Sequence, residues 1–184
     1  MGRERNPRLD IGYSLLELLT TVALGAVLVG LATPALRDLI LDTRRVTDIN
    51  ALVHSVQLAR NEAAKRRQPV VLCKTADRIR CGKDDVTWGQ GWMVFANLDD
   101  ASPPQRSAHE PLIWAHQPAM RGSITANRAS FQFRPFFWRS TNGTVTFCDE
   151  RGVAEARAVI ISYTGRPRVS SQGPGRPLRC ANGL

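Results

Sequence analysis

The chain has 184 residues, and its 25 lysines and arginines exceed its 16 acidic residues, which gives a formal net charge of +9. This length leaves room for one globular domain with its own core, beside an N-terminal leader and a membrane segment. Its 4 cysteines include no Cys-x-x-Cys pair, which argues against a zinc site or a thioredoxin-like redox site.

The N-terminal region combines a short basic segment with a long apolar run. Residues 1–12 carry more arginines than acids, and residues 12–37 contain a single carboxylate, Glu17, and a proline, Pro34. The uncharged stretch 18–36 would form a helix of about 28 Å, enough for one bilayer crossing. The positive-inside rule then places the basic segment in the cytoplasm and the rest of the chain outside.

A carboxylate in such a run is costly, because the bilayer core offers it neither water nor a counter-ion. Glu17 is therefore a functional hypothesis, and the alternative is an anchor that tolerates a stray acid. A secretory signal has its cleavage site after the apolar segment, whereas the candidate site here, after Gly12, precedes it.

The segment Gly12-Tyr13-Ser14-Leu15-Leu16-Glu17-Leu18 resembles the prepilin-peptidase site of type IV pilins and type II secretion pseudopilins. The resemblance implies cleavage after Gly12 and methylation of the new N-terminus at Tyr13, where the family more often has phenylalanine. Pro34 stands where pilins commonly carry a helix-disrupting proline. The implied role of Glu17 is assembly, because pairing with the Tyr13 amine of a neighbouring subunit would offset the cost of both charges in lipid.

The membrane and assembly helix, 13–37, is expected to continue as an amphipathic segment over 38–68. Pro69 is the expected stop, which gives a helix from Tyr13 to about Arg67 that is roughly 80 Å long. Apolar residues recur at three- and four-residue spacing with polar residues between them. The apolar set is Val46, Ile49, Val53, Val56 and Ala63, and the polar set is Arg44, Arg45, Asp48 and Asn50.

Residues 69–184 change to short strand patterns separated by turn residues. The dipeptide Asn142-Gly143 is typical of a two-residue hairpin turn. The predicted fold class is α+β, with a long N-terminal transmembrane helix packed on an antiparallel β-sheet, as in pilins. The expected strands are Val70–Lys74, Gly91–Asn97, Leu112–His116, Ser130–Arg134, Thr144–Cys148 and Arg157–Tyr163.

Disulfides are the expected state of the cysteines, because the domain is placed outside the cytoplasm. Four cysteines allow three pairings. We favour Cys73–Cys81, which closes a short hairpin, and Cys148–Cys180, which pins the C-terminal tail. Free buried thiols are the alternative.

Within the pilin superfamily, the domain resembles minor pilins and pseudopilins of the FimT/GspH type over nearly the whole chain. One departure is the bulky Phe136-Phe137-Trp138, which stands where a glycine-containing bend is expected. The segments that carry the resemblance are Ala59–Ala63, Val71–Cys73, Trp88–Phe95, Asn142–Cys148 and Ile161–Arg166.

The segment Gly165-Arg166-Pro167-Arg168 is similar to the Gly-Arg-x-Arg pattern of FimT-type pilins, which implies DNA binding in natural transformation. An arginine fork suits phosphate oxygens because it donates two parallel hydrogen bonds. Gly165 would allow a sharp turn, and Pro167 would restrict the backbone between the arginines. The alternative is an ordinary solvated basic face. Residues 163–184 contain no acid and four arginines, Arg166, Arg168, Arg176 and Arg179.

Two further patches have weaker functional interpretations. The first patch could be a second contact to a nucleic-acid backbone. We prefer the interpretation that it is charge at the end of the helix, which complements the helix dipole. It comprises Lys65, Arg66, Arg67, Lys74, Arg78 and Arg80. The second patch alternates cationic and aromatic side chains, as a surface that stacks the bases of a single strand would. We prefer the interpretation that its aromatic side chains belong to the hydrophobic core. It comprises Arg134, Phe136, Phe137, Trp138 and Arg139.

No pattern in the chain indicates catalysis. His54, His109 and His116 have no metal-ligand spacing, so we predict no enzyme, metal or cofactor. The resemblance implies a minor type IV pilin that binds DNA and has other pilin subunits and the prepilin peptidase as further partners. It would span the inner membrane with a periplasmic domain before assembly and lie in the pilus afterwards. The alternative is a type II secretion pseudopilin, or a tip pilin that primes assembly, without a DNA ligand.

Overall fold

The computed structural model describes residues 14–135, 140–175 and 177–180. The chain divides into two compact units, Met1–Ile40 and Leu41–Leu184. Helix α1, Leu15–Arg66, contributes residues to both units and agrees with the helix expected from the sequence.

The first unit contains the start of α1. The hydroxyl of Ser14 accepts a hydrogen bond from the backbone N–H of Glu17 at 3.2 Å, as an N-cap side chain does. Glu17 is the acidic residue of the first turn, where the helix dipole favours negative charge. Local helix chemistry therefore already gives Glu17 a favourable position at this end.

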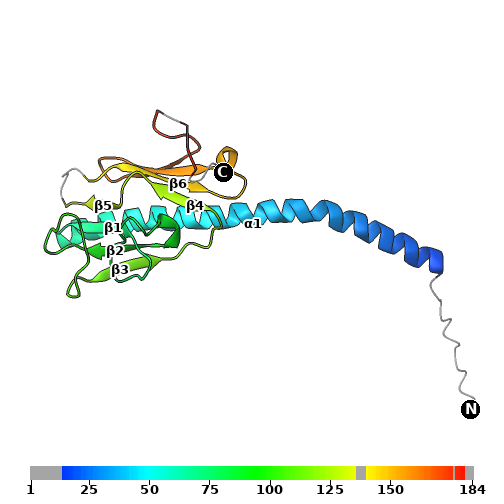
Figure 1. The fold of residues 1–184 in the computed structure, drawn as a ribbon, viewed down its shortest axis with the longest axis horizontal. Coiled ribbons are helices and arrows are strands. Elements are labelled where there is room, and N and C mark those ends of the chain that lie inside the picture. Colours follow the sequence, from blue (N-terminus) through cyan, green and yellow to red (C-terminus); the bar gives the residue numbers. More distant parts are fainter. Residues whose placement is uncertain (1–13, 136–139, 176, 181–184) are drawn as a thin grey trace, which may run out of the picture. The chain divides into compact units, whose positions relative to one another are not determined.

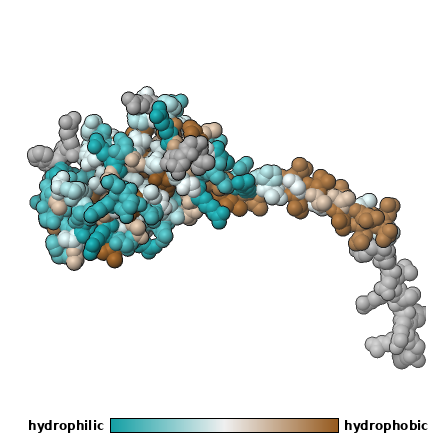
Figure 2. All heavy atoms as spheres, in the orientation of Figure 1, coloured by the Kyte–Doolittle hydropathy of each residue, from teal (hydrophilic) through white to brown (hydrophobic). Residues whose placement is uncertain are grey.

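The rest of this unit is an apolar helix that contains Pro34. α1 continues through Pro34, in agreement with the continuous helix expected from Tyr13 to about Arg67. Proline has no N–H, so only the helical hydrogen bond to the Gly30 carbonyl is lost. Large apolar side chains are exposed along this segment, which Figure 2 shows as a hydrophobic surface. Within the described residues, α1 is the one helix long and apolar enough to cross a membrane.

The second unit consists of residues 41–66 of α1 and two antiparallel sheets of four strands each (Figure 1). One sheet has the strand order β3-β2-β1-β5 and the other β4-β6-β7-β8. The strands of the first sheet are β1 (Val70–Lys74), β2 (Trp92–Ala96), β3 (Leu112–His116) and β5 (Ser130–Phe133), with the short helix η1 (Trp88–Gln90) before β2. Those of the second are β4 (Ser123–Ala126), β6 (Gly143–Cys148), β7 (Arg157–Ile161) and β8 (Pro167–Ser170), with the short helix η2 (Val153–Glu155) before β7.

All six expected strands occur with small changes at their ends, but β4 and β8 were not expected. The predicted Asn142-Gly143 hairpin is wrong, because β5 and β6 belong to different sheets. Gly143 lies in β6 opposite Ile161 instead. A Cβ there would lie 2.5 Å from Asn127 Oδ1 and 2.8 Å from Phe131, so this glycine permits close packing rather than a turn.

One hydrophobic core joins α1 to the inner faces of both sheets. The predicted helical stripe is partly wrong, because Val46 is 50% exposed whereas Leu52 is fully buried. A smaller apolar cluster covers the outer face of the second sheet and includes Ile160 and Leu178. The residues of α1 that are buried in this unit are Leu41, Arg45, Asp48, Ile49, Leu52, Ser55, Val56, Ala59 and Ala63.

Asp48 belongs to this buried face, although the periodicity placed it between the apolar positions. Its side chain is 0% exposed. The carboxylate accepts hydrogen bonds from the backbone N–H groups of Ala119, at 3.1 Å, and Met120, at 2.8 Å. It also lies 2.9 Å from His116 Nε2. These contacts hold the connection between β3 and β4 against α1.

Arg45, three residues earlier, is buried as well and contacts the second sheet where β6 ends, beside the start of β4. Its guanidinium donates to Asp149 at 3.2 Å, to Asp42 at 2.6 Å and to the Glu155 carbonyl. Arg151 completes the network with hydrogen bonds to Asp149 at 2.7 Å and Asp42 at 2.6 Å. Alternating charges therefore compensate one another where β6 ends.

These contacts set the pKa of Asp149. Burial alone would raise the pKa, but hydrogen bonds from Arg151 and the charges of Arg151 and Arg45 outweigh burial and hold it below its ordinary value. A carboxyl with a lowered pKa in the folded state stabilises the fold above its unfolded pKa, about 3.9 for aspartate. This contribution is lost as the pH falls through the folded-state pKa.

We predict that Asp149→Asn lowers the free energy of unfolding by about 2–3 kcal/mol at pH 7, because the buried guanidinium of Arg45 and the partly buried one of Arg151 lose a charged partner. Below pH 4 the difference from wild type should shrink, because the wild-type carboxylate is then being protonated. Urea unfolding of the full-length protein in detergent micelles, followed by tryptophan fluorescence, measures both values. The control is Asp85→Asn at an exposed site. A difference that stays constant with pH would contradict the assignment.

Candidate nucleic-acid interface

Strands β7 and β8 form a hairpin that carries the Gly165–Arg168 segment. The backbone N–H of Ser162 donates to the Arg166 carbonyl at 3.1 Å, and the N–H of Gly165 donates to the Ser162 carbonyl at 2.9 Å. Gly165 has φ +70°, which L side chains rarely adopt. A three-residue loop that ends in a left-handed residue is a common hairpin connection, so the glycine has a conformational reason here.

Gly165 is also buried against the neighbouring elements. A Cβ at this position would lie 3.1 Å from Phe133 Cδ1 and 3.4 Å from Ser140 Oγ. Ser140 further donates its backbone N–H to the Tyr163 carbonyl at 3.0 Å. The hairpin loop is therefore held against β5 and the segment that precedes β6.

Arg166 and Arg168 lie on one face of the hairpin. Arg168 is opposite Ile160 and Pro167 is opposite Ile161, so Arg166 and Arg168 alternate with Pro167 along the edge strand. Residues two apart on a strand are separated by about 6.6 Å. Both arginines are exposed, and neither forms an ion pair with any residue that the structure describes. They are thus two adjacent, uncompensated cations on a fixed backbone.

The C-terminal tail is attached to the same sheet. The structure contains both favoured disulfides, Cys73–Cys81 and Cys148–Cys180. Leu178 is 8% exposed and belongs to the outer apolar cluster that contains Ile160, the cross-strand partner of Arg168. Arg179 follows and is exposed, whereas Arg176 lies outside the described residues.

The other basic patch does not form one surface. Arg66 pairs with Glu62 at 2.6 Å at the end of α1, whereas Arg78 donates to Gln117 at 2.6 Å in the loop after β1. The length of β1 separates these groups. Lys74 is the last residue of β1 and lines a pocket beside the end of β4.

The aromatic patch is described only in part. Arg134 forms a bidentate pair with Asp100 at 3.1 Å. Phe136, Phe137, Trp138 and Arg139 lie outside the described residues.

The histidines have separate surroundings. His116 contacts Asp48, and His54 lies edge-on to Trp114. His109 Nε2 is 3.5 Å from Ser107 Oγ. The described part of the chain contains no group of three or more potential metal ligands. Gly12 and Tyr13 lie outside that part, and Glu17 is exposed in the first turn of α1.

Comparison with known families assigns the domain. A family model described as "Type II transport protein GspH" matches residues 48–165, the majority of the chain. The chain belongs to this family. The match ends at Gly165, so it does not include Arg166, Arg168 or the tail.

Solved structures show the same fold. Two crystal structures of the type IV minor pilin FimU from Pseudomonas aeruginosa strain PAO1 align with TM-scores of 0.52. One is 19% identical and covers 75% of this chain and 100% of that chain; the other is 20% identical and covers 77% and 98%. At these identities the likeness concerns the fold, a long N-terminal helix packed on an antiparallel β-sheet domain. No curated protein sequence matches the chain.

Sequence reasoning missed the strand that presents the arginines. A four-residue segment that begins with proline is a weak strand signal, although proline is tolerated at the first position of an edge strand. Strict alternation of Arg166, Pro167, Arg168 and Val169 was the available clue.

We predict that Gly165→Ala destabilises the protein more than Gly175→Ala. Both glycines have positive φ, +70° and +72°, but a Cβ at Gly175 meets nothing within 4 Å. Backbone strain alone should cost about 1–2 kcal/mol. The crowding against Phe133 should add to this at Gly165, by about 1 kcal/mol. Urea unfolding of the two full-length variants measures the difference, and equal losses would contradict the packing role of Gly165.

Proposed function

We propose that this protein is a minor type IV pilin that binds extracellular DNA through the exposed arginines of the β7–β8 hairpin and contributes to DNA uptake in natural transformation. The observation that carries the proposal is the presentation of Arg166 and Arg168 on one face of the β7–β8 hairpin, without acidic partners among the described residues. Arg179 and Arg176 of the acid-free tail would add to the same positive region.

The chemistry of these side chains suits phosphate. Guanidinium groups donate paired hydrogen bonds to phosphate oxygens, and their charge persists at every physiological pH. Contacts to the backbone carry no sequence information, so binding should be independent of DNA sequence and should weaken steeply with salt. A net charge of +9 assists association with a polyanion.

We predict that Arg166→Ala combined with Arg168→Ala lowers affinity for any duplex at least tenfold and reduces the slope of log K against log salt by about 2, roughly one for each lost phosphate contact. The measurement is fluorescence anisotropy with labelled duplex and full-length protein in detergent micelles, over a salt series. A double variant Arg60→Ala with Arg121→Ala, both exposed sites, controls for the loss of two charges. Equal binding by the two double variants would overturn the proposed site.

The second candidate is a structural subunit without a DNA ligand, either a pseudopilin of type II secretion or a tip pilin that primes assembly. The family match favours it, since the family is described by type II transport and its match ends before Arg166. The duplex titration separates the two candidates, because a purely structural subunit has no salt-dependent affinity attributable to Arg166 and Arg168.

The membrane-proximal chemistry would be that of pilin assembly in both cases. We infer that the prepilin peptidase cleaves after Gly12, that Tyr13 carries the new amine, and that Glu17 pairs with that amine on a neighbouring subunit. The apolar helix and the family support membrane anchoring and assembly with other pilin subunits. The inner membrane before assembly and the pilus surface afterwards are the corresponding locations.

We predict that Glu17→Ala leaves membrane insertion intact but prevents incorporation into filaments, because the neighbour's amine then has no counter-charge in lipid. Ser14→Ala is the control, because it removes the N-cap hydrogen bond to Glu17 and keeps the carboxylate. Immunoblots of membranes and of sheared pili measure insertion and incorporation. Normal amounts of the Glu17 variant in sheared pili would show that the charge pair is not required.

A further inference from the structure

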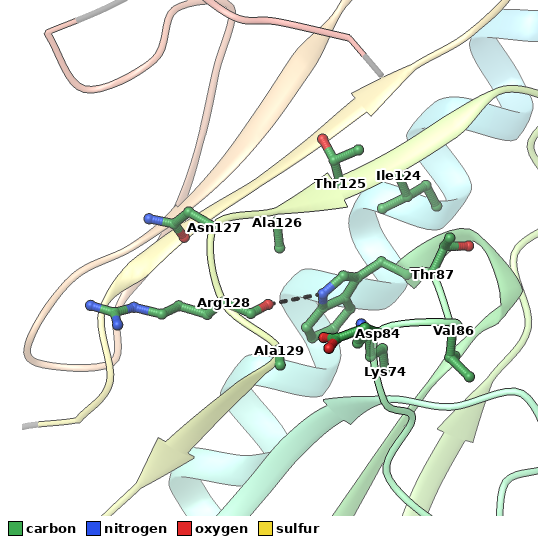
Figure 3. A pocket seen from close by; sticks show the side chains of 11 residues that line it. Lys74, Asp84, Val86, Thr87, Ile124, Thr125, Ala126, Asn127, Arg128 and Ala129 are labelled. Atoms are coloured by element: carbon green, nitrogen blue, oxygen red, sulfur yellow. Dashed lines mark hydrogen bonds between the residues drawn. The ribbon is translucent and has the colours of Figure 1, made fainter. Parts of the chain in front are cut away.

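A pocket of about 350 Å³ lies beside the end of β4, between the turn that connects β4 to β5 and the segment that precedes η1 (Figure 3). Trp88 and Ile124 are buried in its wall, and Lys74 and Arg128 are its two cationic lining residues. Asp84 is the one acid among the residues that line it.

The turn that carries Arg128 is held from two sides. The indole N–H of Trp88 donates to the Arg128 carbonyl at 3.0 Å, the dashed contact in Figure 3. Asn127 exchanges two hydrogen bonds with the backbone of Thr144, at 3.2 Å and 2.9 Å. The backbone of Arg128 is therefore fixed, while its side chain is exposed and has no ion-pair partner within the described residues.

The pocket and the β7–β8 hairpin lie at the same end of the second sheet. The Arg128 side chain passes Gly143, since its Cγ lies 3.2 Å from the position of a Cβ built on that glycine. Gly143 is opposite Ile161, which is opposite Pro167. Two strand spacings, about 10 Å, thus separate Gly143 from Pro167. These three cross-strand partners, the row Gly143–Ile161–Pro167, are uncharged.

We propose that Arg128 and Lys74 form a second phosphate-binding site, which continues the contact of Arg166 and Arg168 across the end of the sheet along one nucleic-acid backbone. The inference rests on the proposed DNA binding. A nucleic acid carries one charge per nucleotide, so a strand held on β8 presents further phosphates to cations about 10 Å beyond it. Ile161 in the middle of this row is buried in the core, so the contact would run around the end of the sheet rather than along the row.

Asp84 allows a test that depends on the direction in which the DNA affinity changes. It borders the same pocket and is exposed, so its charge opposes an anion there. Removal of this charge should strengthen binding, whereas removal of Lys74 or Arg128 should weaken it. A role of these residues in folding alone predicts no such opposition.

The test is the duplex titration with full-length protein in detergent micelles. Arg128→Ala and Lys74→Ala should each lower the affinity about three- to tenfold and reduce the salt slope by about one. Asp84→Asn should raise the affinity. The Arg128 substitution retains the carbonyl that Trp88 contacts, and urea unfolding verifies that each variant is folded. The matched control is Arg121→Ala, which removes an exposed arginine beyond the other end of β4.

The outcomes separate this site from the hairpin site. Loss of binding in the Arg166/Arg168 variant with wild-type affinity and slope for Arg128→Ala, Lys74→Ala and Asp84→Asn would overturn the second site and leave the proposed function standing. Equal losses for Arg121→Ala and Arg128→Ala would overturn it too, because net charge would then be the cause. Unchanged binding in every variant would remove both sites. Weakening by Lys74→Ala and Arg128→Ala together with strengthening by Asp84→Asn supports the second site.

Discussion

One turn of α1 buries two side chains of opposite charge, Arg45 and Asp48, and the arrangement of the second unit depends on how these charges are satisfied. An unpaired buried charge costs several kcal/mol, so both need partners of opposite charge or hydrogen-bonding groups. Asp48 takes its partners from the connection between β3 and β4, which belong to different sheets. Arg45 takes Asp149, directly after β6. The helix is therefore tied to both sheets by directional contacts as well as by the apolar core.

The position of β6 in turn determines where the arginines lie. β6 pairs with β4 on one side and with β7 on the other, and β7 carries β8 at the edge. Gly165 then holds the hairpin loop against Phe133. Charged side chains on an edge strand also discourage pairing with another strand, so Arg166 and Arg168 protect the edge irrespective of any ligand. Edge protection needs charge only, whereas phosphate binding needs the geometry that places both arginines on one face.

Family and fold agree on what kind of molecule this is and are silent on its ligand. The family match and the likeness to FimU describe a long N-terminal helix packed on an antiparallel sheet domain. That scaffold suits many surface chemistries, because function resides in the sites that a fold carries. The exposed Arg166 and Arg168 follow the last residue that the family model matches.

Local signals in the sequence determined the elements themselves. The apolar run with Glu17, the stop at Pro69 and six strand patterns each reflect short-range physics: hydropathy, backbone restriction and side-chain alternation. The same short-range reasoning predicted a hairpin turn at Asn142-Gly143, which the structure does not contain. It also placed Arg45 and Asp48 on the solvent-facing side of the helix, although both are buried. Turn propensity and periodicity contain no information about which distant partner a residue meets.

Only the tertiary structure decided which charges are buried and which are presented. Asp48 and Arg45 are inside because residues about 70 and 100 positions later in the chain supply their hydrogen bonds. Arg166 and Arg168 are outside because β8 pairs with β7 at an edge and its described neighbours offer no acid. The sequence by itself determined a helix long and apolar enough to cross a membrane, followed by a β-rich basic domain. Long-range pairing determined the rest, since the environment of a charge depends on contacts between segments distant in the chain.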